Sequence, residues 1–233
     1  MLSSARVQND EPNLEVSGAK APAHAQVYER LRELVLYGDL VPGQPVTIQG
    51  LAQSLDAGIT PVREAIRRLI AEGALTFHGN RRVSVPILTL SDVEELIYIR
   101  KSLDSELTRR AVAHLAEADI GRLTSIDGAV DAAIEAGDIG LYLRENYRFH
   151  TALYDLARAP VTAGLADRLW LQFGPSLRVV CGRFGTQNLP DRHKEILEAL
   201  SARDADAAAA ATELDIEQGM AQVIDVLRQG GSD

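Results

Sequence analysis

The segment from residue 46 to residue 85 carries an ordered series of signals that few folds can accommodate. Thr47 precedes a short helix, and a tight turn leads from it to a second helix that opens with Thr60 and Pro61. Threonine accepts hydrogen bonds from the first N–H groups of a helix, and proline suits a first helical turn because its missing N–H has no partner there. Two runs of alternating polarity then flank Gly79-Asn80, which is typical of a two-residue hairpin. Because a further amphipathic helix precedes this series, the pattern predicts a winged helix-turn-helix.

The remainder of the chain shows helical periodicity and little strand signal. Gly137, Pro160 and the stretch 182–190 separate its apolar runs, and residues 91–94 form a capping-box pattern near its start. We expect helices near residues 92–116, 119–136, 138–157, 161–181, 191–201 and 204–228. The expected fold class is therefore mainly α, with a flexible N-terminal tail over 1–22, the winged helix-turn-helix over 23–87 and an all-α helical bundle over 88–233.

Charge is distributed unevenly along the chain. The whole sequence has a net charge of -9, whereas residues 20–90 hold 8 bases and 6 acids. An acidic bulk repels phosphates, so any contact with nucleic acid has to be local. The single cysteine, Cys181, rules out an intramolecular disulfide framework and fits a reducing compartment. No run of 18 apolar residues and no secretory signal is found, so we expect a cytoplasmic protein without a membrane partner.

The helix over 60–72 has one apolar side and one polar side. Its polar side carries Thr60, Arg63, Glu64 and Arg67. Guanidinium groups placed this way can bond base edges or phosphates in a major groove. Arg81 and Arg82, at the hairpin tip, are placed to reach the DNA backbone or the minor groove. The alternative is an ordinary surface helix whose arginines are only solvated.

The run Thr60-Pro61-Val62-Arg63-Glu64-Ala65, followed by Leu69-x-x-Glu72-Gly73, resembles the DNA-binding domain of the GntR family of bacterial transcription regulators. The resemblance covers about residues 25–87 and implies a dimer that binds a short palindromic operator in double-stranded DNA, with Arg63 and Arg67 among the contacts. We assign to this surface Thr47, Thr60, Arg63, Glu64, Arg67, Arg81 and Arg82. The family usually has Ser-Arg before Thr-Pro, where this chain has Gly58-Ile59, so one expected arginine contact is absent.

Four polar side chains are predicted to face the interior of the bundle or to flank its apolar stripe. They are Asn146, His150, His193 and Asp215. Asn146 and His150 are four residues apart and share one helix face, while His193 aligns with apolar residues on its own helix. Oxygen and nitrogen donors on three helices can build a metal site inside a bundle. The alternative is that each buried histidine bonds a carboxylate or a backbone group.

The bundle also resembles the FCD ligand-binding domain of FadR-like GntR regulators, over about residues 91–228. The matching residues are Leu96, Arg100, Leu103, Asp104, Asn146, Phe149, His150, His193, Ile196 and Leu197. In many such domains an Asp or Asn and three His bind a divalent metal. The resemblance therefore implies Zn, Ni or Mn at Asn146, His150 and His193, with Asp215 in the place of the third histidine.

The same resemblance implies an effector site beside the metal. Arg100 matches an arginine that approaches the effector in the family, and a bidentate grip on a carboxylate is its natural role. We place Arg178 in the same pocket. The alternative for Arg100 is an ion pair with an acid of the bundle.

These features together predict a metabolite-responsive bacterial transcription regulator. We expect a repressor that binds a palindromic operator as a homodimer, with a small organic acid as effector and a metal assisting its binding. A metal-dependent enzyme would use the inward histidines to hold a water nucleophile, but no general base stands out nearby and the DNA-binding half would be unexplained. A structural chromosome-associated protein would leave the inward polar residues without a role. We therefore expect a regulator that is not an enzyme.

Overall fold

The computed structural model describes residues 23–79, 82–185 and 192–230 of the 233. In order, the elements of this part are α1 (Ala23–Leu36), β1 (Pro45–Val46), α2 (Ile48–Ser54), α3 (Ile59–Ala71), β2 (Thr76–His78), β3 (Arg82–Ser84), α4 (Leu90–Val112), α5 (Glu117–Ala136), α6 (Ile139–Leu156), α7 (Pro160–Phe184), α8 (His193–Ser201) and α9 (Ala205–Gly230). The mainly α fold class is confirmed. The tail expected over 1–22 and the side chain of Arg81 lie outside the described residues.

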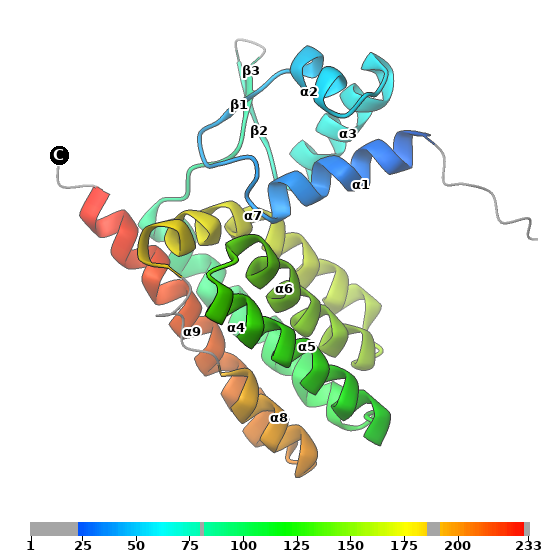
Figure 1. The fold of residues 1–233 in the computed structure, drawn as a ribbon, viewed down its shortest axis with the longest axis vertical. Helices are drawn as coiled ribbons and strands as arrows, with labels where there is room; N and C mark the ends of the chain where they lie inside the picture. Colours follow the sequence, from blue (N-terminus) through cyan, green and yellow to red (C-terminus); the bar gives the residue numbers. More distant parts are fainter. Residues whose placement is uncertain (1–22, 80–81, 186–191, 231–233) are drawn as a thin grey trace, which may run out of the picture.

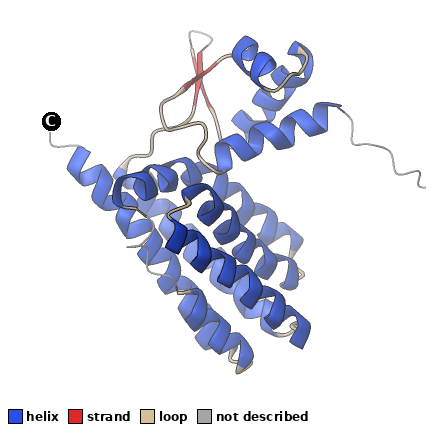
Figure 2. Ribbon diagram, viewed as in Figure 1, coloured by secondary structure: helices blue, strands red, loops and turns tan. Residues whose placement is uncertain are grey.

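The first three helices and the small sheet form the winged helix-turn-helix (Figures 1 and 2). β2 and β3 form the expected antiparallel hairpin, with Phe77 opposite Val83. The sequence did not predict β1, which pairs with β3 through Val46 and makes the strand order β1-β3-β2. Pro45 is tolerated because β1 lies at the edge of the sheet, where a missing N–H breaks no ladder.

Some helices begin earlier than expected, including α3 and α4. α3 starts at Ile59, with Gly58 at the cap position, so Thr60 lies inside the first turn rather than capping it. Pro61 is still accommodated, because the first N–H groups of a helix have no partner within the helix. α4 is capped by Thr89, whose hydroxyl accepts from the N–H of Asp92 while the Asp92 carboxylate accepts from the N–H of Thr89. The capping box therefore lies two residues before the predicted one.

The remaining six helices form a bundle below the winged part (Figure 1). α4 packs along α9, α5 packs on α6, and α8 turns back against α9. Within the described residues, no helix is apolar over a stretch long enough to cross a lipid bilayer.

The winged part and the bundle share one hydrophobic core, which includes Leu36 of α1 and both Phe173 and Leu177 of α7. At their junction the two backbones come very close. A Cβ on Gly174 would lie 2.2 Å from the carbonyl oxygen of Leu36, so only glycine fits there. The junction is also tied by an ion pair between Arg32 of α1 and Asp167 of α7, 2.7 Å apart. A movement of α7 in the bundle would therefore displace α1 directly.

Candidate functional site

The exposed face of α3 has the chemistry of a recognition helix. α3 buries Val62, Ala65, Ile66 and Leu69 against the core and leaves Thr60, Arg63, Glu64 and Arg67 exposed. Arg67 Nη1 lies 2.9 Å from Glu64 Oε1, and two-thirds of the Arg67 side chain is accessible. Surface pairs of this kind are weak, so the Arg67 guanidinium can exchange this partner for a base edge or a phosphate at small cost.

A groove of about 850 Å³ separates α3 from the sheet. Arg63 and Arg67 line it from α3, Arg82 lines it from β3, and the exposed ring of Phe77 lines it from β2. Thr47 also borders the groove, where its hydroxyl accepts from the N–H of Gly50 and so caps α2. Thr60 and Glu64 do not line the groove, and Arg81 lies outside the described residues. The structure thus gathers three of the predicted arginines around one open surface.

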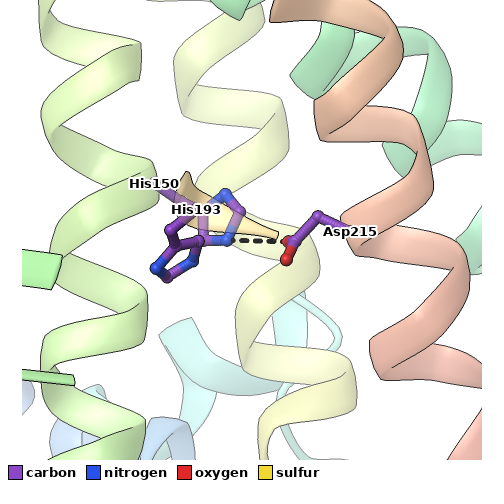
Figure 3. Close-up of side chains that lie close together, drawn as sticks. All are labelled: His150, His193 and Asp215. Carbon is purple, nitrogen blue, oxygen red and sulfur yellow. Dashed lines mark ion pairs between the residues drawn. The ribbon is translucent and has the colours of Figure 1, made fainter. Parts of the chain in front are cut away.

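The second cluster of predicted residues lies deep in the bundle. His150 of α6, His193 of α8 and Asp215 of α9 point toward one another (Figure 3). One donor atom from each lies within 4.8 Å of the others, and His150 Nε2 is 3.3 Å from Asp215 Oδ2. Both histidine side chains are only 1% exposed. Residues from three helices, spread over 66 positions of the sequence, therefore lie together in the interior of the bundle.

Burial and charge set the protonation of this cluster. Burial lowers the pKa of His150 below its usual value, so the imidazole is neutral near neutral pH. Burial alone would raise the pKa of Asp215, but its hydrogen bond with His150 and the nearby His193 and Arg100 lower it to about 2. A neutral imidazole beside an ionised carboxylate is the state that metal coordination requires.

Two residues of the cluster, His150 and Asp215, border a cavity of about 30 Å³, and His193 lies beside them without lining it. Asn146, one turn before His150 on α6, lines this cavity together with His150 and Asp215. The cavity is large enough for one ion or one water molecule. Within the described part of the chain, His150 Nδ1 is buried and has no hydrogen-bond partner. An unpaired buried polar atom is uncommon and is often explained by an ion or water. Two imidazoles, a carboxylate and an amide oxygen suit a borderline divalent metal such as Zn, Ni or Mn.

Arg100 of α4 borders the same cavity but already has a partner. Its Nη2 lies 3.0 Å from Asp104 Oδ2, one turn along α4, and both side chains are almost fully buried. The guanidinium also lies over the rings of Trp170 and Phe173, 4.7 and 4.3 Å from their centroids. The alternative of an ion pair with an acid of the bundle is thus present in the structure, while the guanidinium stays at the cavity.

Arg178 does not line the cavity, contrary to the expectation. Leu177 does, and the next residue points about 100° further around an α-helix. The Arg178 guanidinium instead donates to the carbonyl oxygen of Tyr37 at 3.3 Å and lies 3.5 Å from Asp39. Arg178 therefore belongs to the junction with the winged part.

Three residues next to the site were missed by the sequence reasoning. Asp127 of α5 contacts His193, Trp170 of α7 contacts His150, and Tyr147 of α6 contacts Trp170. None of them forms a spacing motif with its partner, because each contact joins different helices. The only available signal was the scarcity of aromatics, since Trp170 is the single tryptophan of the chain.

Tyr147 links the buried cluster to the winged part. It lies one turn before His150 on α6, and its ring contacts Trp170 at a centroid distance of 5.4 Å. Trp170 in turn lies 5.2 Å from the His150 ring. The Tyr147 hydroxyl donates to Asp167 and accepts from Arg32 of α1 at 3.0 Å. A continuous series of contacts therefore runs from the cluster to α1.

Comparison with known proteins agrees with this architecture. Residues 23–85 match the gntR family of bacterial regulatory proteins, and residues 95–218 match the FCD domain. The HTH-type transcriptional regulator McbR of Escherichia coli (strain K12) is 29% identical over 182 residues, which cover 77% of this chain and 82% of McbR. The HTH-type transcriptional repressor RspR of the same organism is 23% identical over 216 residues, 91% of this chain and 93% of RspR.

A solved structure shows the same arrangement. The structure of E. coli McbR/YncC aligns with a TM-score of 0.80 and 27% identity over 91% of this chain and 99% of that chain. The relatives named above are transcriptional regulators, which argues against the enzyme hypothesis. With both domain matches in place, the chain belongs to the GntR family of bacterial regulatory proteins and is a transcriptional regulator with an FCD domain, not an enzyme.

Proposed function

We propose that this chain is a repressor that binds a palindromic operator as a homodimer and is released by a small organic acid bound beside a divalent metal. The observation that carries the proposal is the series of contacts from His150 through Trp170 and Tyr147 to Arg32 of α1. It joins a buried donor cluster to the part of the molecule that presents arginines to solvent. Binding at one end can therefore change the placement of the other.

Asn146, His150, His193 and Asp215 would hold the metal. When bound, the ion supplies a fixed positive charge that attracts a carboxylate. The neutral state of His150 and the low pKa of Asp215 favour such an ion over a proton at this point.

Arg100 would bind the effector carboxylate from the other side of the cavity. The guanidinium has five N–H donors, so it can bind the effector carboxylate while it keeps Asp104, and neither buried carboxylate is left without a cation. A cavity of about 30 Å³ cannot hold an organic acid, since ligand pockets typically enclose about 300–1,000 Å³. The lining helices α4, α6, α7 and α9 therefore have to part when the effector binds.

Movement of α6 provides the regulatory step. Tyr147 lies on α6 and holds Arg32 of α1, so a displaced α6 shifts the winged part relative to the bundle. In a homodimer such a shift changes the separation of the two α3 helices, which then match or miss adjacent half-sites one helical turn apart. A differential effector affinity of a few kcal/mol between the two arrangements is sufficient.

The proposed operator contacts use Arg63 and Arg67 in the major groove and the hairpin residues Arg81 and Arg82 on the backbone or minor groove. Arg63, Arg67 and Arg82 are exposed, which supports this role. The relative RspR is named a repressor, which supports the sign of regulation. The protein would act in the cytoplasm, at the nucleoid.

Binding to DNA from upstream of its own gene tests the proposal. Fluorescence anisotropy is measured with the metal-free protein, the metal-loaded protein and the metal-loaded protein with a panel of sugar acids, dicarboxylates and aromatic acids. We expect salt-sensitive binding by a dimer and release by one class of acid. Binding that no acid alters, or that persists with a monomer at every concentration, would contradict the proposal.

A further inference from the structure

Asp127 stands next to the donor cluster without being one of its expected ligands. It lies on α5 and contacts His193 of the cluster. Its Oδ1 lies 3.2 Å from Nδ1 of His193, and the two side chains are 6% and 1% exposed. Burying a carboxylate beside a histidine costs desolvation free energy. A contact of this kind is therefore expected to have a structural or functional role.

The geometry defines which ring nitrogen of His193 carries the hydrogen. A carboxylate accepts hydrogen bonds and cannot donate, so the Nδ1–H of His193 donates to Asp127. In that tautomer Nε2 carries no hydrogen, so it is the ring nitrogen able to bind a metal ion. The ring is held from its flat side as well, because Phe149 stacks on it at 3.9 Å with an interplanar angle of 13°. Orientation and tautomer are both determined before any ion arrives.

We propose that Asp127 is a positioning residue that presents Nε2 of His193 to the metal. This inference rests on the metal site proposed above. An outer carboxylate that accepts from a ligating histidine fixes its tautomer, aims its ring and increases the electron density on the ligand nitrogen. α5 would thus contribute to the site without contacting the ion. The ligands themselves come from α6, α8 and α9.

The competing explanation is that Asp127 only anchors α8 to α5 through a surface ion pair. Lys194 offers such a pair, with Nζ 3.9 Å from Asp127 Oδ2. The same Nζ lies closer to Asp131, at 2.8 Å. Asp131 is one turn further along α5 and its side chain is 44% exposed, so it pairs with Lys194 from the solvent side of the helix pair. It is therefore a matched control for the loss of one negative charge at this helix pair.

The test compares Asp127→Asn, Asp127→Ala and Asp131→Asn with the wild-type full-length protein. Affinity for Ni²⁺ and for Zn²⁺ is measured by competition with a chromophoric chelator. The tautomer of His193 is measured in the metal-free protein by ¹⁵N NMR of labelled histidine, assigned with a His193→Gln variant. Circular dichroism and thermal unfolding establish that each variant is folded. If Asp127→Ala does not fold, the comparison is made with Asp127→Asn alone.

We expect both Asp127 variants to bind metal roughly 10- to 100-fold more weakly, the range for outer partners of ligating histidines. The His193 resonances should move from the pure Nδ1–H form toward a mixture of tautomers. Asp131→Asn should leave both readouts unchanged. Equal affinity in Asp127→Asn and Asp131→Asn, or a His193 tautomer unaffected by either Asp127 variant, overturns this inference alone. A wild-type protein that binds neither ion overturns the metal site together with it.

Discussion

The face of α3 and the interior of the bundle hold the two polar clusters that matter to function, and they are built in opposite ways. Arg63 and Arg67 are exposed, and Arg67 has only a surface ion pair with Glu64, so little in the protein fixes their side chains. His150 and His193 are sealed in the core, ordered by Trp170, Phe149 and Asp127 before any ligand is present. The side-chain geometry of the first cluster is set by the molecule it binds, whereas that of the second is set by the surrounding protein.

Electrostatics sharpens this contrast. The exposed cluster lies in the only stretch of the chain with a basic excess, whereas residues 91–233 hold 24 acids and 15 bases. Long-range attraction to DNA is therefore weak, and affinity has to come from short contacts of α3 and the wing. The buried cluster is screened little by salt, because its charges are out of solvent. Salt should therefore act strongly on DNA binding and weakly on metal binding.

The largest expected effect is on the exposed cluster. The double change Arg63→Ala and Arg67→Ala should weaken operator binding by roughly 2–6 kcal/mol, since each base-reading arginine contributes about 1–3 kcal/mol. Because both side chains are exposed, thermal unfolding should hardly change. Anisotropy titrations at several salt concentrations measure the loss.

A change in net charge alone has to be separated from the loss of contacts. Arg122→Ala removes one positive charge at an exposed position of α5, far from α3 in sequence, and should leave DNA affinity nearly unchanged. Tight binding retained by the double variant would show that α3 is not the recognition helix.

The next effect falls on the buried cluster. His150→Ala removes one donor of the metal site, and Ni²⁺ or Zn²⁺ affinity should fall by more than the roughly 10- to 100-fold expected for an outer partner. DNA binding by the metal-free protein should persist, because α3 is untouched. Chelator competition and anisotropy report the two quantities on the same sample.

His114→Ala is the matched control, since His114 is exposed on the bundle and outside the cluster. Because a buried imidazole leaves a cavity, His150→Gln serves where His150→Ala does not fold. Unchanged metal affinity in both His150 variants would remove the site from the proposal.

The same contrast explains how much could be predicted from the sequence. The face of α3 follows from helical spacing alone, because exposure needs no knowledge of a partner. Helix limits in the bundle were predicted to within a few residues, since glycine and proline mark them. His150, His193 and Asp215 were found because each points inward on its own helix.

What could not be predicted was the partner of each inward residue. Asp127 and His193 are 66 positions apart, and Arg32 and Tyr147 are 115 apart. Such contacts depend on how helices pack, which spacing within one helix does not specify. The position of Arg178 and the strand β1 were not predicted for the same reason. Their partners, Tyr37 and β3, come from other parts of the chain.

The junction between the two regions offers a smaller, structural test. Gly174→Ala places a methyl group against the carbonyl oxygen of Leu36, so α1 and α7 have to separate. We expect a loss of about 1–3 kcal/mol in the free energy of unfolding, as for other overpacked sites. Gly164→Ala on the same helix meets no atom within 4 Å and should instead stabilise the protein by about 0.5–1 kcal/mol. Equal effects of the two changes in denaturant unfolding would show that the close approach of α1 and α7 is absent in solution.

A change with a small expected effect on stability carries the most information about coupling. Tyr147→Phe removes only the hydroxyl between Arg32 and Asp167 and leaves the ring on Trp170 and the direct Arg32–Asp167 pair in place. The free energy of unfolding should fall by about 0.5–1.5 kcal/mol, the usual contribution of one hydrogen bond. Metal affinity and DNA affinity, each measured alone, should stay close to wild type. The ratio of DNA affinities with and without bound metal and acid should fall toward one, since α6 then moves without carrying Arg32 with it. Tyr98→Phe, at a position three-quarters exposed, is the control and should preserve the ratio. A Tyr147→Phe protein that keeps the full ratio would show that the two regions communicate by another route, such as the close packing at Gly174.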